Sequence, residues 1–197
     1  DPNELIKPAV EGTLNVFRAA LKHGVKKIVL TSSIVAIMEP GRSEKIYTEK
    51  DWAPADQLGA YAKSKTLAEQ AAWDFVAQTE AFELVTINPG LVIGPTITSS
   101  GFTSAEIVSK LITGGAPGMP KFMFNTVDVR DVAKAHILGM ECKEAGGNRF
   151  VTVEGNYWMK AIGKSLKTEF KPYGYKVKDN ELPFCVVKLA TLWDPDV

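Results

Sequence analysis

The sequence has few cysteines and histidines, no excess charge of either sign and no long apolar run, and each shortage excludes a class of protein. Two cysteines and two histidines occur in 197 residues. Because Cys142 and Cys185 share no motif with a histidine, we expect no metal site and reduced thiols in the cytoplasm. The 23 basic residues balance the 23 acidic ones, which argues against a nucleic-acid partner. No apolar run approaches the length of a membrane span, so we expect no membrane partner.

What remains is the composition of an ordinary soluble globular protein. Apolar residues make up 45% of the chain and charged residues 23%, which are typical values. The length suits one large domain, or one domain with an appendage. The sequence begins at Asp1 without a methionine and enters a predicted helix almost at once, so we expect a fragment with sequence missing upstream.

The first predicted elements are a helix and a buried strand. Apolar residues recur at three- or four-residue intervals from Leu5 to Leu21 and predict a helix, opened by Asp1-Pro2 and ended at His23-Gly24. Pro8 should kink this helix or mark its true start. The β-rich run from Val25 to Leu30 predicts a strand. A helix followed by a buried strand is the repeating unit of a parallel α/β sheet, so the fold class is α/β.

The same alternation continues along the chain. A second helix begins between 57 and 61 and presents an apolar face as far as Val76. His136 lies inside a later helix, and we expect it to be a packed or surface residue. The further predicted strands are 83–88, 121–127 and 149–154, and the further predicted helices are 104–113, 128–142, 157–170 and 184–193.

Tyr61 and Lys65 form the first chemical pair. They lie four residues apart at the start of a segment of strong helix formers, so both side chains should project from one helix face. A lysine ammonium beside a phenol favours ionisation of the phenol, which suits a proton donor to a carbonyl oxygen. The same spacing also arises by chance on amphipathic helices.

Two segments at the ends of predicted strands could complete a site. Ligands of open α/β sheets bind at the carboxyl ends of the strands, where the first strand runs into Thr31-Ser32-Ser33. Ser32 or Ser33 could donate a hydrogen bond to a substrate carbonyl, or both could form an ordinary turn. The second strand runs into residues 89–95, PGLVIGP, which we expect to form a rigid loop whose backbone faces a ligand. Residues 39–58 form a long polar connection.

Four motifs resemble, in order, the extended short-chain dehydrogenase/reductase family: Ser32-Ser33 after VKKIVLT, Tyr61-x-x-x-Lys65, INPGLVIGP at 87–95, and VDVRDVAKAH at 127–136. YAKSKTLAEQAAW at 61–73 and DPNELIKPAVEGTLNV at 1–16 are similar to the dihydroflavonol reductase, cinnamoyl-CoA reductase and aldehyde reductase branch. The resemblance implies a partial Rossmann-like, doubly wound parallel sheet with a smaller α/β substrate-binding region. Residues 1–100 would be the C-terminal half of the NAD(P)-binding domain, and 101–197 mainly substrate-binding, with segments near 121–142 returning to the Rossmann core.

The resemblance also implies an activity, the reduction of an aldehyde or ketone by hydride transfer from NADP(H), with NAD(H) the less favoured cofactor. Tyr61 would be the general acid, Lys65 would favour its ionisation and bind the nicotinamide ribose, and Ser33 would be the catalytic serine. Substrates would be small carbonyl compounds or alcohols. The cofactor-binding residues implied are Thr31, Ser32, Tyr61, Lys65, Pro89, Gly90, Leu91 and Val92.

The sequence departs from the family in one respect, because it contains no G-x-x-G-x-x-G run to hold a pyrophosphate. The leading strands of the nucleotide-binding half are therefore expected to be missing. The resemblance also implies that a stretch after Val197 is missing, because members of the family continue beyond this point. We expect the isolated chain to bind NADP(H) weakly or not at all, which isothermal titration with NADPH would test. A sheet without its leading strands exposes an edge that favours pairing with a second copy, a homo-oligomer.

Two alternatives remain open. The first is a nucleotide-sugar epimerase or dehydratase on the same fold. Dehydratases carry an acidic pair after the strand-end hydroxyl and epimerases commonly carry Val-Tyr-Gly, whereas this chain has Ile34-Val35-Ala36-Ile37. The second is a non-catalytic protein that keeps the fold without turnover.

Overall fold

The chain folds into two units in the computed structural model, which describes residues 3–39, 45–97, 103–115 and 118–183. The first unit consists of Asp1–Gly90 and Val129–Thr152. The second consists of Leu91–Asp128 and Val153–Val197. Each unit therefore draws on two separate stretches of sequence. The substrate-binding role expected for 101–197 stays a prediction.

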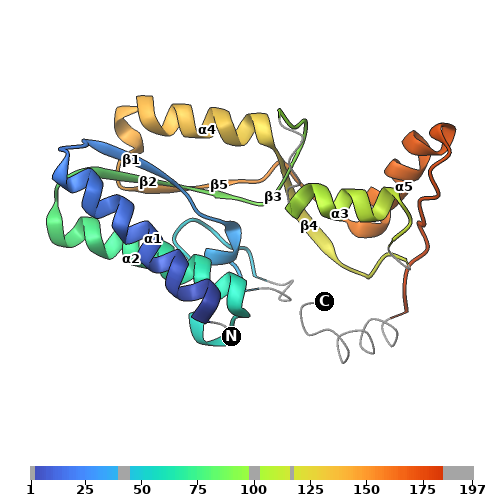
Figure 1. Cartoon of the computed structure of the whole chain (residues 1–197), viewed down its shortest axis with the longest axis horizontal. Coiled ribbons are helices and arrows are strands. Elements are labelled where there is room, and N and C mark those ends of the chain that lie inside the picture. The colour runs from blue at the N-terminus through green and yellow to red at the C-terminus, as the bar shows by residue number, and fades with distance from the viewer. Residues whose placement is uncertain (1–2, 40–44, 98–102, 116–117, 184–197) are drawn as a thin grey trace. The chain divides into compact units, whose positions relative to one another are not determined.

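A parallel sheet forms the centre of the first unit (Figure 1). Its strand order is β1-β2-β5, and both neighbouring pairs are parallel. Helices α1 and α2 pack together on one face and α4 covers the other (Figure 1). This doubly wound α/β arrangement confirms the predicted fold class. The elements are α1 Asn3–Lys22, β1 Lys27–Thr31, α2 Ala60–Thr79, β2 Glu83–Pro89, α4 Val129–Glu141 and β5 Asn148–Thr152.

Aromatic packing joins the two helices of the first layer to the sheet. Phe17 of α1 is 1% exposed and clusters with buried Ala72, Phe82 and Leu84. The Phe17 ring meets Phe75 and Phe82 edge to face, with ring centroids 5.9 and 5.5 Å apart. This cluster holds α2, the helix that carries Tyr61 and Lys65, against α1 and β2.

The second unit has a mixed sheet with order β3-β4-β6. β3 and β4 are parallel, whereas β4 and β6 are antiparallel. Helices α3 and α5 pack against one another, α3 also against β3 and α5 against β6. The bounds are β3 Leu91–Ile93, α3 Thr103–Ile112, β4 Met123–Asp128, β6 Gly155–Trp158 and α5 Met159–Phe170. Short 3-10 turns occur at Ile34–Ala36 (η1), Ala55–Gln57 (η2), Lys143–Ala145 (η3) and Lys171–Tyr173 (η4).

Pro8 does not mark the start of the first helix, which begins at Asn3 and continues through it. An α-helix leaves its first four N–H groups without an intrahelical partner. A proline this close to the start removes only one backbone hydrogen bond. The amphipathic pattern from Leu5 to Leu21 supports the remaining turns.

Two predictions about local structure are wrong. Residues 89–95 do not form one loop, because β2 continues to Pro89 and Leu91–Ile93 form β3 after a bend at Gly90. The strand-prone triplet pairs in parallel with Thr126–Asp128. The helix expected from Tyr157 begins at Met159, because Tyr157 and Trp158 pair with Phe124 and Met123 of β4.

The other predicted elements match the structure within a few residues, except those outside the described residues. The cap at Asp1-Pro2 and the helix at 184–193 lie there. Within the described ranges, no helix is long and apolar enough to cross a membrane.

Candidate active site

Tyr61 and Lys65 lie in the first two turns of α2. The helix begins at Ala60, after Gly59 in an extended conformation, so Tyr61 stands at the helix entrance and Lys65 one turn further on. The Tyr61 residue is 58% exposed, whereas Lys65 is half-buried. The Tyr61 residue is therefore accessible from solvent, and Lys65 lies one turn further along the same helix.

The two serines after β1 have different environments. The Ser32 N–H donates to the Ile87 carbonyl (2.8 Å), which extends the pairing of β1 with β2. Ser32 is buried, and its hydroxyl donates to the Glu69 carboxylate (2.5 Å). Ser33 is half-buried and caps η1, where its Oγ accepts a long hydrogen bond from the Val35 N–H (3.4 Å). The Ser33 hydroxyl proton can therefore be donated to a ligand, whereas that of Ser32 is engaged.

Thr31, a predicted cofactor-binding residue, ends β1 beside α4. Its Oγ1 lies 2.6 Å from Nε2 of His136. The Nδ1 of that ring lies 2.8 Å from the Val132 carbonyl, which can only accept, so Nδ1 carries a proton and donates. His136 thus has a packing role, as expected, and the Thr31 side chain has a protein partner.

A small cavity of about 120 Å³ brings several of these residues together. Lys65, Thr31 and Ser32 line it, with Glu69 at its wall. Its remaining lining residues are Ala9, Thr13, Leu30 and Ala68. Tyr61 and Ser33 do not line this cavity, but their segments meet, because α2 packs against η1 and Thr66 Oγ1 donates to the Val35 carbonyl (3.4 Å).

The predicted backbone contacts divide between the units. Pro89 ends β2, and the Gly90 N–H donates to the Thr152 carbonyl at the end of β5 (3.1 Å). The buried Thr152 hydroxyl has no hydrogen-bond partner among the described residues. Leu91 and Val92 start β3 in the second unit. Of these four residues, only Pro89 and Gly90 therefore lie at a strand end of the first sheet.

Sequence reasoning missed a buried carboxylate beside the serines. Glu69 of α2 has a fully buried side chain and an ion pair with Arg149 Nε of β5 (2.7 Å). Its oxygens also accept hydrogen bonds from Ser32, Trp73, Thr86 and Asn88. Glu69 follows Lys65 by four residues on the helix face predicted to be apolar, and a charge at such a position was the one available signal.

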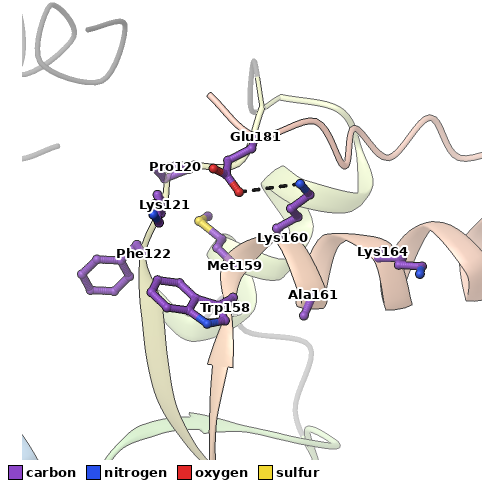
Figure 2. A pocket seen from close by; sticks show the side chains of 9 residues that line it. All are labelled: Pro120, Lys121, Phe122, Trp158, Met159, Lys160, Ala161, Lys164 and Glu181. Atoms are coloured by element: carbon purple, nitrogen blue, oxygen red, sulfur yellow. Dashed lines mark ion pairs between the residues drawn. The ribbon is translucent and has the colours of Figure 1, made fainter. Parts of the chain in front are cut away.

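The second unit contains a larger cavity of about 540 Å³ at the start of α5 (Figure 2). Figure 2 shows the Phe122 and Trp158 side chains beside Met159, and the Lys160 ammonium facing Glu181 (3.7 Å). The other lining residues are Pro120, Lys121, Ala161 and Lys164. Its walls offer apolar surface, lysine ammonium groups and the Glu181 carboxylate, but no side-chain hydroxyl.

Within the described residues, no three histidine, cysteine, aspartate or glutamate side chains gather closely enough to hold a metal ion. Cys142 is exposed, and its Sγ lies 3.1 Å from Glu144. That contact, together with the Glu144 backbone, lowers the pKa of the Glu144 carboxyl.

Several known proteins similar to this chain are reductases. It is 43% identical to cinnamoyl-CoA reductase CAD2 of Medicago truncatula, over 75% of this chain and 47% of the relative. It is 36% identical to cinnamoyl-CoA reductase 1 of Arabidopsis thaliana, over 93% of this chain and 55% of the relative. The crystal structure of yeast methylglyoxal/isovaleraldehyde reductase Gre2 complexed with NADPH matches with a TM-score of 0.82 and 28% identity, over 91% of this chain and 59% of that one.

The chain thus spans about half the length of the curated relatives it matches. Residues 1–152 match the family described as the NAD dependent epimerase/dehydratase family. That match covers all of the first unit and its candidate residues, and it confirms the resemblance seen in the motifs. The chain belongs to the NAD dependent epimerase/dehydratase family.

Proposed function

We propose that the chain supplies the catalytic residues of an NADP(H)-dependent reductase that acts on a small aldehyde or ketone. The observation that carries this proposal is the exposed Tyr61 phenol on the same helix as half-buried Lys65, next to the segment that holds Ser33. A proton donor, a cation and a second hydroxyl donor are the groups that carbonyl reduction requires of a protein.

The described residues fit the nicotinamide end of such a cofactor. Lys65, Thr31 and Ser32 line a cavity at the carboxyl end of β1, where ligands of open α/β sheets bind. Gly90 adds a bend at the end of neighbouring β2. We therefore propose Thr31, Ser32, Tyr61, Lys65, Pro89, Gly90, Leu91 and Val92 as the cofactor-binding residues. When bound, a reduced nicotinamide supplies the hydride that the carbonyl carbon receives.

The residues of the chain then have distinct tasks. The Tyr61 hydroxyl donates its proton to the carbonyl oxygen as that oxygen gains negative charge, and solvent returns a proton to the exposed phenolate. The Lys65 ammonium stabilises the phenolate. The Ser33 hydroxyl donates a hydrogen bond to the same oxygen, which stabilises the charge developing there.

Reduction is favoured over epimerisation or dehydration by two observations. The similar relatives are named as reductases, and Ile34-Val35 after the strand-end serines matches neither the acidic pair of dehydratases nor Val-Tyr-Gly. We infer that substrates are small carbonyl compounds. A homo-oligomer and a cytoplasmic location stay predictions that size-exclusion chromatography and imaging of a tagged protein would test.

The Tyr61→Phe variant of the full-length protein tests the proposal. NADPH oxidation would be followed by absorbance with methylglyoxal, isovaleraldehyde and cinnamoyl-CoA. We expect Tyr61→Phe to lower kcat about a hundredfold or more, because general acid catalysis contributes that much. Tyr173→Phe, at another exposed tyrosine, should keep the parent activity. Near-normal turnover of Tyr61→Phe would remove the basis of the assignment.

A further inference from the structure

We propose that Glu69 and Arg149 are positioning residues that hold the strand-end serines and the 49–52 segment in register for the reaction. The inference concerns residues that the proposed function does not use, and its catalytic part rests on that function. The centre of the arrangement is the Glu69 carboxylate, whose side chain is 0% exposed. The Arg149 side chain is 9% exposed.

The Glu69 carboxylate is fully satisfied inside the first unit. A carboxylate has about four acceptor positions. Oε2 accepts from the Ser32 hydroxyl (2.5 Å) and the Asn88 amide (2.8 Å). Oε1 accepts from Arg149 Nε (2.7 Å), the Thr86 hydroxyl (3.1 Å) and Trp73 Nε1 (3.3 Å). The ion thus joins α2 to the ends of β1 and β2 and to β5.

Arg149 extends this arrangement to a distant segment. One terminal nitrogen of its guanidinium donates to the carbonyls of Glu49 (2.9 Å) and Asp51 (2.5 Å). The other donates to the Ala36 carbonyl of η1 (3.5 Å). The guanidinium carbon also lies 3.8 Å from the centre of the Trp52 ring, in cation–π geometry. A single cation therefore fixes β5, η1 and the 49–52 segment relative to Glu69.

The arrangement separates the tasks of the two serines. The Ser32 hydroxyl is engaged by Glu69. The Asn88 amide bonds both Glu69 and the Ser33 carbonyl (3.1 Å), which fixes the Ser33 backbone. The Ser33 Oγ accepts only from the Val35 N–H (3.4 Å) among the described contacts, so its proton can be donated to a substrate oxygen. Ser32 orients, and Ser33 is the hydroxyl that acts.

The charged Glu69–Arg149 pair fixes the geometry of its neighbours but adds little to the net free energy of unfolding. Desolvation offsets most of the attraction within a buried ion pair, so a packed apolar pair is often as stable. An apolar side chain at this position, however, would accept no hydrogen bonds, whereas the Glu69 carboxylate accepts five and so fixes the positions of their donors. A directional network sets where Ser33 and the 49–52 segment lie, which matters for a hydrogen bond to a reacting oxygen.

The first test measures hydrogen exchange by mass spectrometry in the chain as it stands. Glu69→Gln keeps the side-chain volume but removes the charge. We expect exchange in 32–38 and in 49–53 to rise together by about fivefold or more, since both segments lose the same anchor. Ser32→Ala should raise exchange in 32–38 alone. Glu83→Gln, which breaks the ion pair between the exposed Glu83 carboxylate of β2 and Lys27 of β1, should change neither segment.

The second test is a kinetic double-mutant cycle in the full-length protein. We expect Glu69→Gln to lower kcat about tenfold or more with the KM for NADPH unchanged, because a misplaced hydroxyl donor weakens transition-state stabilisation. In a Ser33→Ala background the same substitution should have little further effect. A merely structural role would give equal losses in both backgrounds, and that result would overturn the proposal.

The two readouts separate this inference from the proposed function. If the parent protein reduces no carbonyl compound, the proposed function fails, and exchange still decides the positioning role. Unchanged exchange in either segment after Glu69→Gln would overturn that role even in an active enzyme. If Glu69→Gln does not fold, Arg149→Lys replaces it. It keeps the charge but lacks the fork of donors, so we expect the same coupled rise in exchange.

Discussion

Replacing Phe17 by leucine should destabilise the first unit by about 1–3 kcal/mol. Phe17 is 1% exposed and makes edge-to-face contacts with Phe75 and Phe82 at interplanar angles of 88° and 70°. Such aromatic pairs contribute about 0.5–1.5 kcal/mol each beyond the area they bury, and leucine loses both. Phe17→Ala also empties the site, so its loss should reach about 3–5 kcal/mol.

Urea unfolding followed by circular dichroism measures the free energy of unfolding of each variant. The matched control is Val16→Ala, one residue away on α1 but 63% exposed, which should change the free energy by no more than about 0.5 kcal/mol. The reasoning fails if Phe17→Leu and Val16→Ala lower the free energy of unfolding equally, or if Phe17→Ala lowers it less than Phe17→Leu does. An unchanged urea dependence would show that the variants unfold from the same compact state.

Two further predictions concern charge and glycine. Hydrogen bonds from Lys45 and from the Thr48 backbone lower the pKa of the Asp51 carboxyl from its ordinary 3.8 to about 2. The ionised carboxylate therefore stabilises the 48–51 turn above about pH 4, and this stabilisation is lost as the pH falls through about 2. An NMR titration of the Asp51 carboxyl with a midpoint at or above 3.8 would contradict this prediction. A Cβ on Gly139 of α4 would lie 3.2 Å from Val85 Cγ1, so Gly139→Val should destabilise by about 1–3 kcal/mol. Gly12→Ala, in open space on exposed α1, should stabilise by up to about 1 kcal/mol, and in thermal unfolding equal shifts for the two variants would contradict the packing argument.

Sequence alone predicts the helices and strands of the first unit well, because each shows a local pattern of apolar residues. Apolar residues from Leu5 to Leu21 recur every three to four positions, and the strands at 25–30 and 83–88 are short segments rich in apolar and β-branched residues between turn signals. Both the parallel sheet and the helical placement of Tyr61 and Lys65 follow from these local patterns. Chemical roles for this pair rest on the family resemblance, because spacing alone is common.

The failures occur where distant residues decide the structure. Leu91–Ile93 become a strand only because Thr126–Asp128 pair with them, and the local sequence PGLVIGP does not identify that partner. Tyr157 and Trp158 likewise take their strand conformation from β4. Glu69 is the clearest case, since its partners come from the ends of β1 and β2 and from β5. Residue periodicity does not identify such long-range partners.

The division of the chain into units has a consequence for the order of folding. The chain passes from the first unit to the second after Gly90, returns after Asp128 and leaves again after Thr152. Glu69 and Arg149 are 80 positions apart in the sequence, and the whole Leu91–Asp128 stretch of the second unit lies between them. During synthesis on the ribosome, Glu69 therefore cannot pair with Arg149 until β5 has been synthesised. The sheet of the first unit cannot add β5 before then. Because the units alternate along the sequence, no single cleavage of the chain can separate them.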